Sequence, residues 1–316
     1  MRLVQLYRVL VLAYYPTKQQ FEQNTSYTYP VSEFIFQIVL PLALVMMMFT
    51  MGLSLSIADF ARVFKRPVAF SLGAFNQILV LPVIAFAMIG VFDLDIEFAV
   101  GMMILAACPG GIVSNVISYL GRADAALSVS LTACVSLLSL ITMPLLVAFS
   151  INHFDTQQSI ADFPYLRLVI TLLVITIIPV LSGILLRKYK YDLANALLPT
   201  MDKLTGIFFI IVVVAAIASN WNDVLVNLPM LGTVLISYSI LLLLWGLLSA
   251  RLVGLPIRST ATIAIETSVQ NVATAILICS TVLQNDAYYI PAALYGVLMY
   301  GPSMLLVIWM RKHFSN

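Results

Sequence analysis

One carboxylate stands deep inside an otherwise apolar stretch of the chain. Glu266 is the only acidic residue well within any long apolar run, and it opens the segment ETSVQN (residues 266–271), in which five of six residues are polar. A lone carboxylate at the middle of a membrane costs about 2.5–3.5 kcal/mol on insertion scales. It therefore needs a proton, a basic partner or a bound cation. No Lys or Arg lies deep inside the predicted spans, so a proton or a bound cation is the expected partner.

A second break lies in an earlier apolar run. The letters CPGG at residues 108–111 are followed by Ser114 and Asn115. Proline removes a backbone donor, and each glycine lowers helix stability by about 1 kcal/mol. Taken alone, this pattern predicts only a proline kink. Paired with residues 266–271, it predicts two interrupted helices, and such pairs in the two halves of a transporter indicate a substrate and ion site near the membrane midplane.

Further oxygen-bearing side chains lie in other apolar runs. Ser128 and Thr132 are four residues apart, so they share one face of a helix. Gln77 lies midway along a different run. A Ser or Thr in such a helix can instead bond to its own backbone, and from the residues alone both interpretations remain open.

The cysteines and histidines indicate no other chemistry. Cys108, Cys134 and Cys279 lie in apolar runs without the spacing of metal ligands, which is typical of small core residues. His153 and His313 stand in polar connectors without a carboxylate or cysteine arranged around them. We therefore predict no transition-metal site, no cofactor beyond a coupling ion and no enzymatic activity.

The elements that must position the polar residues are membrane helices. Of the 316 residues 62% are apolar and 9% are charged, against about 25% charged in soluble domains. The net charge of +2 gives no reason to expect a nucleic-acid partner. A spanning helix needs about 20 apolar residues. The predicted fold class is an all-α polytopic membrane protein with about nine transmembrane helices, in the runs 34–55, 69–91, 98–120, 125–150, 165–186, 204–219, 230–250, 260–283 and 288–310.

The connectors between these runs alternate in charge, and Lys and Arg gather on the cytoplasmic side of a membrane. The connectors after the odd-numbered runs carry Arg62, Lys65, Arg66, Arg122, Arg187, Lys188, Lys190, Lys203, Arg251, Arg258, Arg311 and Lys312. The other connectors are acidic, with Arg167 as their one basic residue. We predict a multi-pass protein of the plasma membrane, the inner membrane of a bacterium, with its N-terminus outside and its C-terminus in the cytoplasm. Residues 1–33 are expected to form an extracytoplasmic extension, 34–312 the transporter domain and 313–316 a cytoplasmic tail.

These motifs together resemble the bile acid:sodium symporter family. The resemblance rests on MGLSL at 51–55, CPGG at 108–111 with the Ser and Asn that follow, and Glu266 with Gln270 and Asn271, which agree with the family in order and spacing. It implies inverted repeats that form a core and a panel, with two discontinuous helices crossing in the core. The implied core covers about 69–150 and 230–310, and the implied panel about 34–55 and 165–219.

The resemblance also implies two sodium sites that share one carboxylate. The first would use Ser114, Asn115, Ser128, Thr132 and Glu266. The second would use Gln77, Glu266 and Gln270 with the main-chain carbonyls of Thr267 and Val269. All the side-chain ligand types of the family are present, which favours a functional role for the two hydroxyls of the fourth run.

The chain departs from the family around the implied substrate. Ser268 stands where glycine is frequent, Ile112 where a polar residue is frequent, and Met299 and Tyr300 replace polar residues of the last helix. These departures argue against a bile acid as the natural cargo. The positive ends of the half-helices still favour an organic anion. The substrate-binding candidates are Ile112, Val113, Asn271, Met299 and Tyr300.

The predicted function is sodium-coupled symport of an organic anion, a small carboxylate or a bile-acid-like molecule, by alternating access. The alternative within the same architecture is a proton-coupled or uncoupled exporter of the arsenite-carrier type, with Glu266 as a proton relay. A membrane-embedded enzyme or sensor fits less well, because no predicted span holds a histidine and the tails are short. The expected partners are sodium, the organic anion and the lipid bilayer, and no obligatory protein partner is indicated.

Overall fold

The computed structural model describes residues 35–55, 66–154 and 165–313, and every named element within them is a helix. The predicted extension 1–33 and the last residues of the predicted tail lie outside the described residues. Seven helical segments are long and apolar enough to cross a membrane, and two shorter apolar helices, Ile96–Ala107 and Val272–Val282, accompany them. The predicted all-α multi-pass membrane fold is confirmed.

The two shorter helices are halves of the predicted broken runs. The third run forms α8 (Ile96–Ala107) and α9 (Ile112–Leu120), and the eighth forms α15 (Ile257–Ser268) and α16 (Val272–Leu277), which the π-helical turn η5 (Ile278–Val282) extends. The backbone is extended at Cys108 and at Val269, where the first half of each run ends. Both breaks therefore occur where the polar and proline-glycine segments predicted them.

The other seven runs are continuous. Their bounds are η1 (Ile35–Val39) with α4 (Leu40–Ser54); α6 (Pro67–Phe75), η2 (Asn76–Val80) and α7 (Leu81–Phe92); α10 (Ala125–Phe154); α11 (Tyr165–Leu172), η4 (Leu173–Ile177) and α12 (Ile178–Tyr189); α13 (Tyr191–Ser219); α14 (Trp221–Leu252); and η6 (Ala287–Tyr289), α17 (Ile290–Leu298) and α18 (Tyr300–His313). The π turns η2 and η4 each end just before the first turn of a helix that carries a proline there. A proline frees a carbonyl of the preceding turn, which accommodates such a bulge.

Two helices begin earlier than their apolar runs. The α13 helix starts at residue 191 and α14 at residue 221, whereas the predicted runs started at 204 and 230. The added turns of α13 contain Pro199, Asp202 and Lys203. Charged residues lower the local hydropathy without lowering helix propensity much, so hydropathy understated the length of these helices.

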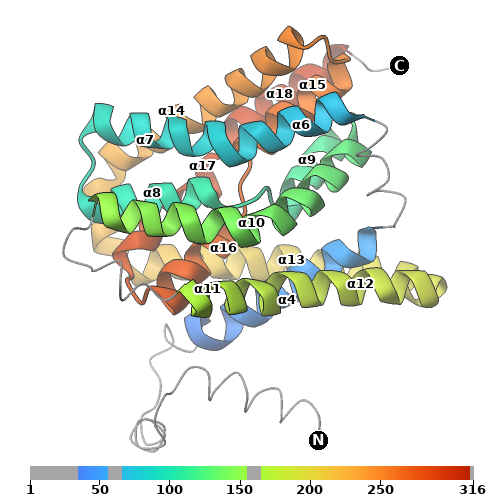
Figure 1. The fold of residues 1–316 in the computed structure, drawn as a ribbon, viewed down its shortest axis with the longest axis horizontal. Coiled ribbons are helices and arrows are strands. Elements are labelled where there is room, and N and C mark those ends of the chain that lie inside the picture. The colour runs from blue at the N-terminus through green and yellow to red at the C-terminus, as the bar shows by residue number, and fades with distance from the viewer. Residues whose placement is uncertain (1–34, 56–65, 155–164, 314–316) are drawn as a thin grey trace, which may run out of the picture. The chain divides into compact units, whose positions relative to one another are not determined.

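One group of helices packs through close backbone contacts. In Figure 1, α4, α12 and α13 run beside one another, and their mutual contacts agree with this. A Cβ at Gly52 of α4 would lie 2.2 Å from the carbonyl oxygen of Val180 in α12, and one at Gly183 would lie 2.5 Å from that of Phe49. Small residues that let backbones approach are typical of helix association in membranes.

The remaining helices form a second set of contacts. The α15 half-helix packs along α14, α8 packs against both α7 and α10, and α9 packs against α10 (Figure 1). A Cβ at Gly246 of α14 would lie 2.6 Å from Cα of Ala264 in α15. The implied division into panel and core, the motion of one against the other and the inverted repeats remain predictions.

The basic connectors meet one another. The Arg66 guanidinium contacts the Asp124 carboxylate, and the Asp124 N–H donates to the Arg258 carbonyl (3.3 Å). A Cβ at Gly121 would lie 3.2 Å from Val307 of α18. Elsewhere Arg167, the basic residue of the acidic connectors, donates to the Thr281 carbonyl (2.9 Å). The segment that contains Arg66 and the connector before α10 are thus neighbours in space, beside the start of α15.

Candidate functional site

The two broken helices meet at their breaks. Gly110 and Gln270 form an isolated antiparallel β-bridge, and the Asn271 N–H donates to the Pro109 carbonyl (3.0 Å). The Tyr295 hydroxyl of α17 donates to the Ser268 carbonyl (2.7 Å). Backbone groups released by the interrupted helices are thus paired inside protein, which is the condition for irregular backbone at membrane depth.

The Glu266 carboxylate lies among three hydroxyls at this crossing. Ser114 of α9 donates to Oε1 (2.6 Å), Ser128 of α10 contacts the same oxygen, and Thr132 of α10 donates to Oε2 (2.9 Å). Glu266, Ser114, Ser128 and Thr132 are all buried. Ser128 and Thr132, whose spacing puts them on one face of a helix, both contact the carboxylate of Glu266 in α15.

Asn115 adds another oxygen to this group. Its Oδ1 lies 2.8 Å from the Ser128 hydroxyl and 3.3 Å from that of Thr132. We call the five side chains Ser114, Asn115, Ser128, Thr132 and Glu266 the carboxylate cluster. They are the residues of the first predicted sodium site, and the structure brings all five together.

The carboxylate cluster holds more acceptors than protons. Each hydroxyl carries one proton, yet Ser114 also faces the Gly111 carbonyl (2.6 Å), and Thr132 also faces the Ser128 carbonyl (3.0 Å). Both Glu266 oxygens and Asn115 Oδ1 compete for the same three protons. A hard monovalent cation satisfies such a set, because it accepts several oxygen lone pairs at once and compensates the buried charge.

Gly110 allows the carboxylate to reach the crossing. A Cβ at this position would lie 2.6 Å from Glu266 Oε2. The neighbouring Gly111 has ordinary space, since its Cβ would lie 3.4 Å from the nearest atom, the Gln270 carbonyl oxygen. Of the two glycines, the first is therefore the one at which an added Cβ would displace the carboxylate from its position.

The second predicted set forms an amide chain. Gln77 Nε2 donates to Gln270 Oε1 (2.5 Å) and to the Cys108 carbonyl (2.9 Å), and Gln270 Nε2 donates to the Thr267 carbonyl (2.9 Å). The N–H of Val269 bonds to Ile265 (2.9 Å). The contacts shown for the Glu266 carboxylate go to the first set. The structure thus joins Gln77, Gln270 and the Thr267 carbonyl, and the role of Glu266 and Val269 in a second site stays a prediction.

Asn76 is a buried polar residue that the sequence argument missed. Its Nδ2 contacts the hydroxyls of Ser249 (3.1 Å) and Thr267 (3.4 Å), and its Oδ1 accepts from the Trp245 indole (3.1 Å). It sits beside Gln77 in the π turn η2, and π turns often occur at functional sites. Two adjacent amides in the middle of an apolar run were the available signal.

The substrate candidates come from three different elements and differ in their surroundings. Ile112 and Val113 stand in the first turn of α9, whose N-terminus has no side-chain cap. Asn271 instead caps α16 by accepting from the Thr274 N–H (3.2 Å). Met299 is fully buried, and Tyr300 lies against Phe209 of α13, with the two rings 6.5 Å apart.

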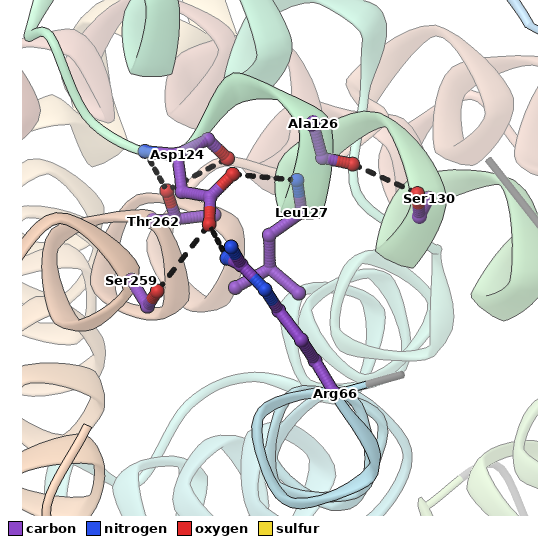
Figure 2. Close-up of polar contacts among 7 residues, drawn as sticks. All are labelled: Arg66, Asp124, Ala126, Leu127, Ser130, Ser259 and Thr262. Atoms are coloured by element: carbon purple, nitrogen blue, oxygen red, sulfur yellow. Dashed lines mark hydrogen bonds and ion pairs between the residues drawn. The ribbon is translucent and has the colours of Figure 1, made fainter. Parts of the chain in front are cut away.

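A second carboxylate, Asp124, holds the ends of three helices together (Figure 2). Oδ1 accepts from the Leu127 N–H at the start of α10 (3.1 Å), and Oδ2 contacts Arg66, next to α6, and Ser259 of α15 (3.4 Å). The Thr262 hydroxyl of α15 bonds to the Asp124 backbone at its N–H (2.9 Å) and its carbonyl (3.1 Å). We call this group the Asp124 clamp. It aligns α10 and α15, which carry most of the carboxylate cluster.

Comparison with known proteins relates this chain to sodium-dependent transporters. Residues 41–228, more than half of the chain, match the model of the sodium bile acid symporter family. The chain is 29% identical over 271 residues to the probable sodium/metabolite cotransporter BASS1, chloroplastic, of Arabidopsis thaliana, covering 84% of this chain and 65% of the plant protein, slightly less than two thirds of its length. It is 26% identical over 266 residues to the uncharacterized sodium-dependent transporter YocS of Bacillus subtilis, covering 84% and 81% of the two chains.

A human relative is similar over most of both chains. The ileal sodium/bile acid cotransporter of Homo sapiens is 30% identical over 255 residues, which cover 79% of this chain and 70% of the human protein. Together with the family match and the crossing broken helices, this similarity shows that the chain belongs to the sodium bile acid symporter family.

Proposed function

We propose that this protein couples the entry of an organic anion to the inward movement of sodium. The observation that supports this most directly is the carboxylate cluster, in which a buried carboxylate faces hydroxyls and an amide oxygen that together have too few protons. Relatives whose names describe sodium/metabolite and sodium/bile acid cotransport support the same coupling ion. A cluster that only relayed a proton would not need five converging oxygen-bearing side chains.

Sodium would bind between the five side chains of the carboxylate cluster. The three hydroxyls would turn their lone pairs toward the ion and their protons toward the Gly111 and Ser128 carbonyls and other acceptors nearby. The ion would neutralise Glu266, which lowers the cost of keeping a carboxylate at membrane depth. It would also draw α9, α10 and α15 together, since each contributes to the cluster.

A second sodium would use the amide chain. Gln77, Gln270 and the carbonyls of Thr267 and Val269 would supply its oxygens, with Glu266 shared between the two ions. The present pairing of Gln77 with Gln270 (2.5 Å) must then rearrange so that amide oxygens, rather than an amide N–H, face the ion. Because only the second site needs this rearrangement, we expect the first sodium ion to bind at the carboxylate cluster and the second ion to follow.

The anion would bind beside the start of α9. The N–H groups of Ile112 and Val113 lie at its uncapped N-terminus, and such a terminus attracts negative charge. Tyr300 and Phe209 bring a ring from each helix group to their boundary, where a cargo would contact both. Since Asn271 already caps α16, its side chain contributes less to the anion than the sequence suggested.

Transport would follow alternating access in a plasma membrane. The group α4, α12 and α13 would move against the remaining helices, with the breaks at the centre. The neighbouring basic connectors would face the cytoplasm, which places the N-terminus outside and the C-terminus inside.

The test is a comparison of ions on the purified full chain. Sodium chloride should raise the melting temperature relative to potassium chloride at equal ionic strength, because binding to the folded state stabilises it. In proteoliposomes, uptake of labelled small carboxylates and sterol anions should then require an inward sodium gradient. If the melting temperature changes with pH but not with sodium, the proposal fails and the proton-coupled exporter is favoured instead.

A further inference from the structure

A pocket of about 480 Å³ opens where the basic connectors meet. Its lining residues are Tyr119, Leu120, Arg122, Ala123, Arg258 and Arg311. Ser114 lies six residues before Leu120 on α9, about 9 Å at 1.5 Å per residue. Arg258 lies eight residues before Glu266 on α15, about 12 Å. The pocket is therefore separate from the carboxylate cluster.

Three arginines from three elements line this pocket. Arg122 lies in the connector after α9, Arg258 in the first turn of α15 and Arg311 in the last turn of α18. None of the six described lining residues is acidic. Like charges around one cavity repel, so the pocket favours an anionic occupant.

The residue types at the pocket indicate which class of anion fits it. Arginine presents planar N–H forks that match the oxygens of phosphate or carboxylate, and several such groups are typical of phosphate recognition. Tyr119 and Leu120 are exposed at the rim, and Trp309 is exposed one turn before the end of α18. Aromatic and apolar side chains beside arginines are typical of the membrane–water interface.

We propose that this pocket binds a phosphate-type anion between Arg122, Arg258 and Arg311. The phosphate could be that of an anionic phospholipid head group or that of a free phosphorylated compound. In either case the bound anion would connect α15, the α9–α10 connector and α18 at one end of the molecule. It would therefore stabilise the fold there without touching the proposed sodium ligands.

The experiment measures the melting temperature of the full chain purified in a neutral detergent. The probes are dioctanoyl phosphatidylglycerol, dioctanoyl phosphatidylcholine as the zwitterionic control, inorganic phosphate and glycerol phosphate. The test variant is Arg258→Gln/Arg311→Gln. The matched control is Arg251→Gln, an exposed arginine in the last turn of α14 that does not line the pocket.

We expect at least one phosphate probe to raise the melting temperature of the wild-type protein, whereas phosphatidylcholine has no effect. Each lost guanidinium contact should weaken binding by about tenfold, so the double variant should lose the response and Arg251→Gln should keep it. A response to phosphatidylglycerol alone identifies a lipid head group. An equal response to inorganic phosphate or glycerol phosphate identifies a soluble anion.

The proposal is overturned if no phosphate probe stabilises the wild-type protein, or if Arg251→Gln weakens the response as much as the double variant does. Should the double variant fail to fold, Arg311→Lys keeps the charge but removes the fork, and native mass spectrometry then compares its retained anion with that of the wild-type protein. Equal retention would contradict the proposal. The sodium response should survive in Arg258→Gln/Arg311→Gln, so this inference and the proposed transport function can fail separately.

Discussion

Two carboxylates join the same pair of helices in opposite directions. Glu266 projects from α15 to the hydroxyls of Ser128 and Thr132 on α10, and Asp124, just before α10, contacts Ser259 and Thr262 on α15. The Asp124 carboxylate contacts the Arg66 guanidinium. The contacts shown for the Glu266 carboxylate are hydroxyls.

The difference between these carboxylates separates the structural role of Asp124 from the transport role that we propose for Glu266. A carboxylate that only holds helices together can take its cation from the chain, as Asp124 does from Arg66. A carboxylate that must release its cation on the other side of a membrane has to take it from solution. A permanent guanidinium beside Glu266 would compete with sodium for the same oxygens.

The largest effect is expected from Glu266→Gln. Glutamine keeps the shape and can still accept from the hydroxyls, but it removes the charge that holds the ion. A hydrogen-bonded charge contributes about 1.5–3 kcal/mol, and two ions would share it, so sodium binding should weaken by about 100-fold or more. The measurement is the sodium-dependent rise in melting temperature. Unchanged sodium-dependent stabilisation and uptake in this variant would remove Glu266 from the site.

Gly110→Ala tests the same site by a steric effect, because it adds one methyl group beside the Glu266 carboxylate. Its Cβ would lie 2.6 Å from Glu266 Oε2, so the carboxylate must shift from its position beside the hydroxyls. We expect sodium affinity to fall by about tenfold or more, as for the loss of one charged contact. Gly111→Ala is the matched control, because its Cβ has ordinary space. Equal effects of the two substitutions would show that helix breaking, rather than contact with the carboxylate, sets the affinity.

Thr132→Val removes one oxygen at nearly constant volume. Loss of one neutral ligand should weaken sodium binding by about three- to tenfold, since a typical hydrogen bond contributes about 0.5–1.5 kcal/mol. Ser136→Ala serves as the control, because this buried hydroxyl donates to the Thr132 carbonyl (2.7 Å) one turn away from the carboxylate cluster. Sodium titrations of both variants give the comparison, and a weaker site in Ser136→Ala than in Thr132→Val would contradict it.

The smallest effect on sodium is expected at the Asp124 clamp. Asp124→Ala loses a helix cap, which costs about 0.5–2 kcal/mol, and an ion pair with a largely exposed arginine, which contributes at most about 1 kcal/mol. The melting temperature should fall, while sodium affinity should change by less than about threefold, or about 0.6 kcal/mol. Arg66→Gln should lower the melting temperature less than Asp124→Ala. A loss of sodium affinity as large as that of Glu266→Gln would contradict the separation of roles.

Much of the fold could be read from local patterns. Hydropathy located the seven long apolar helices and the two shorter ones of the described residues, and the segments at 108–111 and 266–271 located both breaks. It underestimated α13 and α14, because helices continue through polar turns that hydropathy alone rejects. Residues such as Asn76 and Tyr295 were missed because their importance depends on partners far along the chain.

The sequence by itself determined the membrane environment, the positions of the two helix breaks and the presence of one buried carboxylate without an internal basic partner. These properties depend on composition and short-range order, which the chain carries locally. Only the tertiary structure decided that Ser114, Ser128 and Thr132 reach the same carboxylate, that Gly110 leaves room for it, and that three arginines surround one pocket. Most of these contacts join residues more than a hundred positions apart, and the packing of helices brings them together.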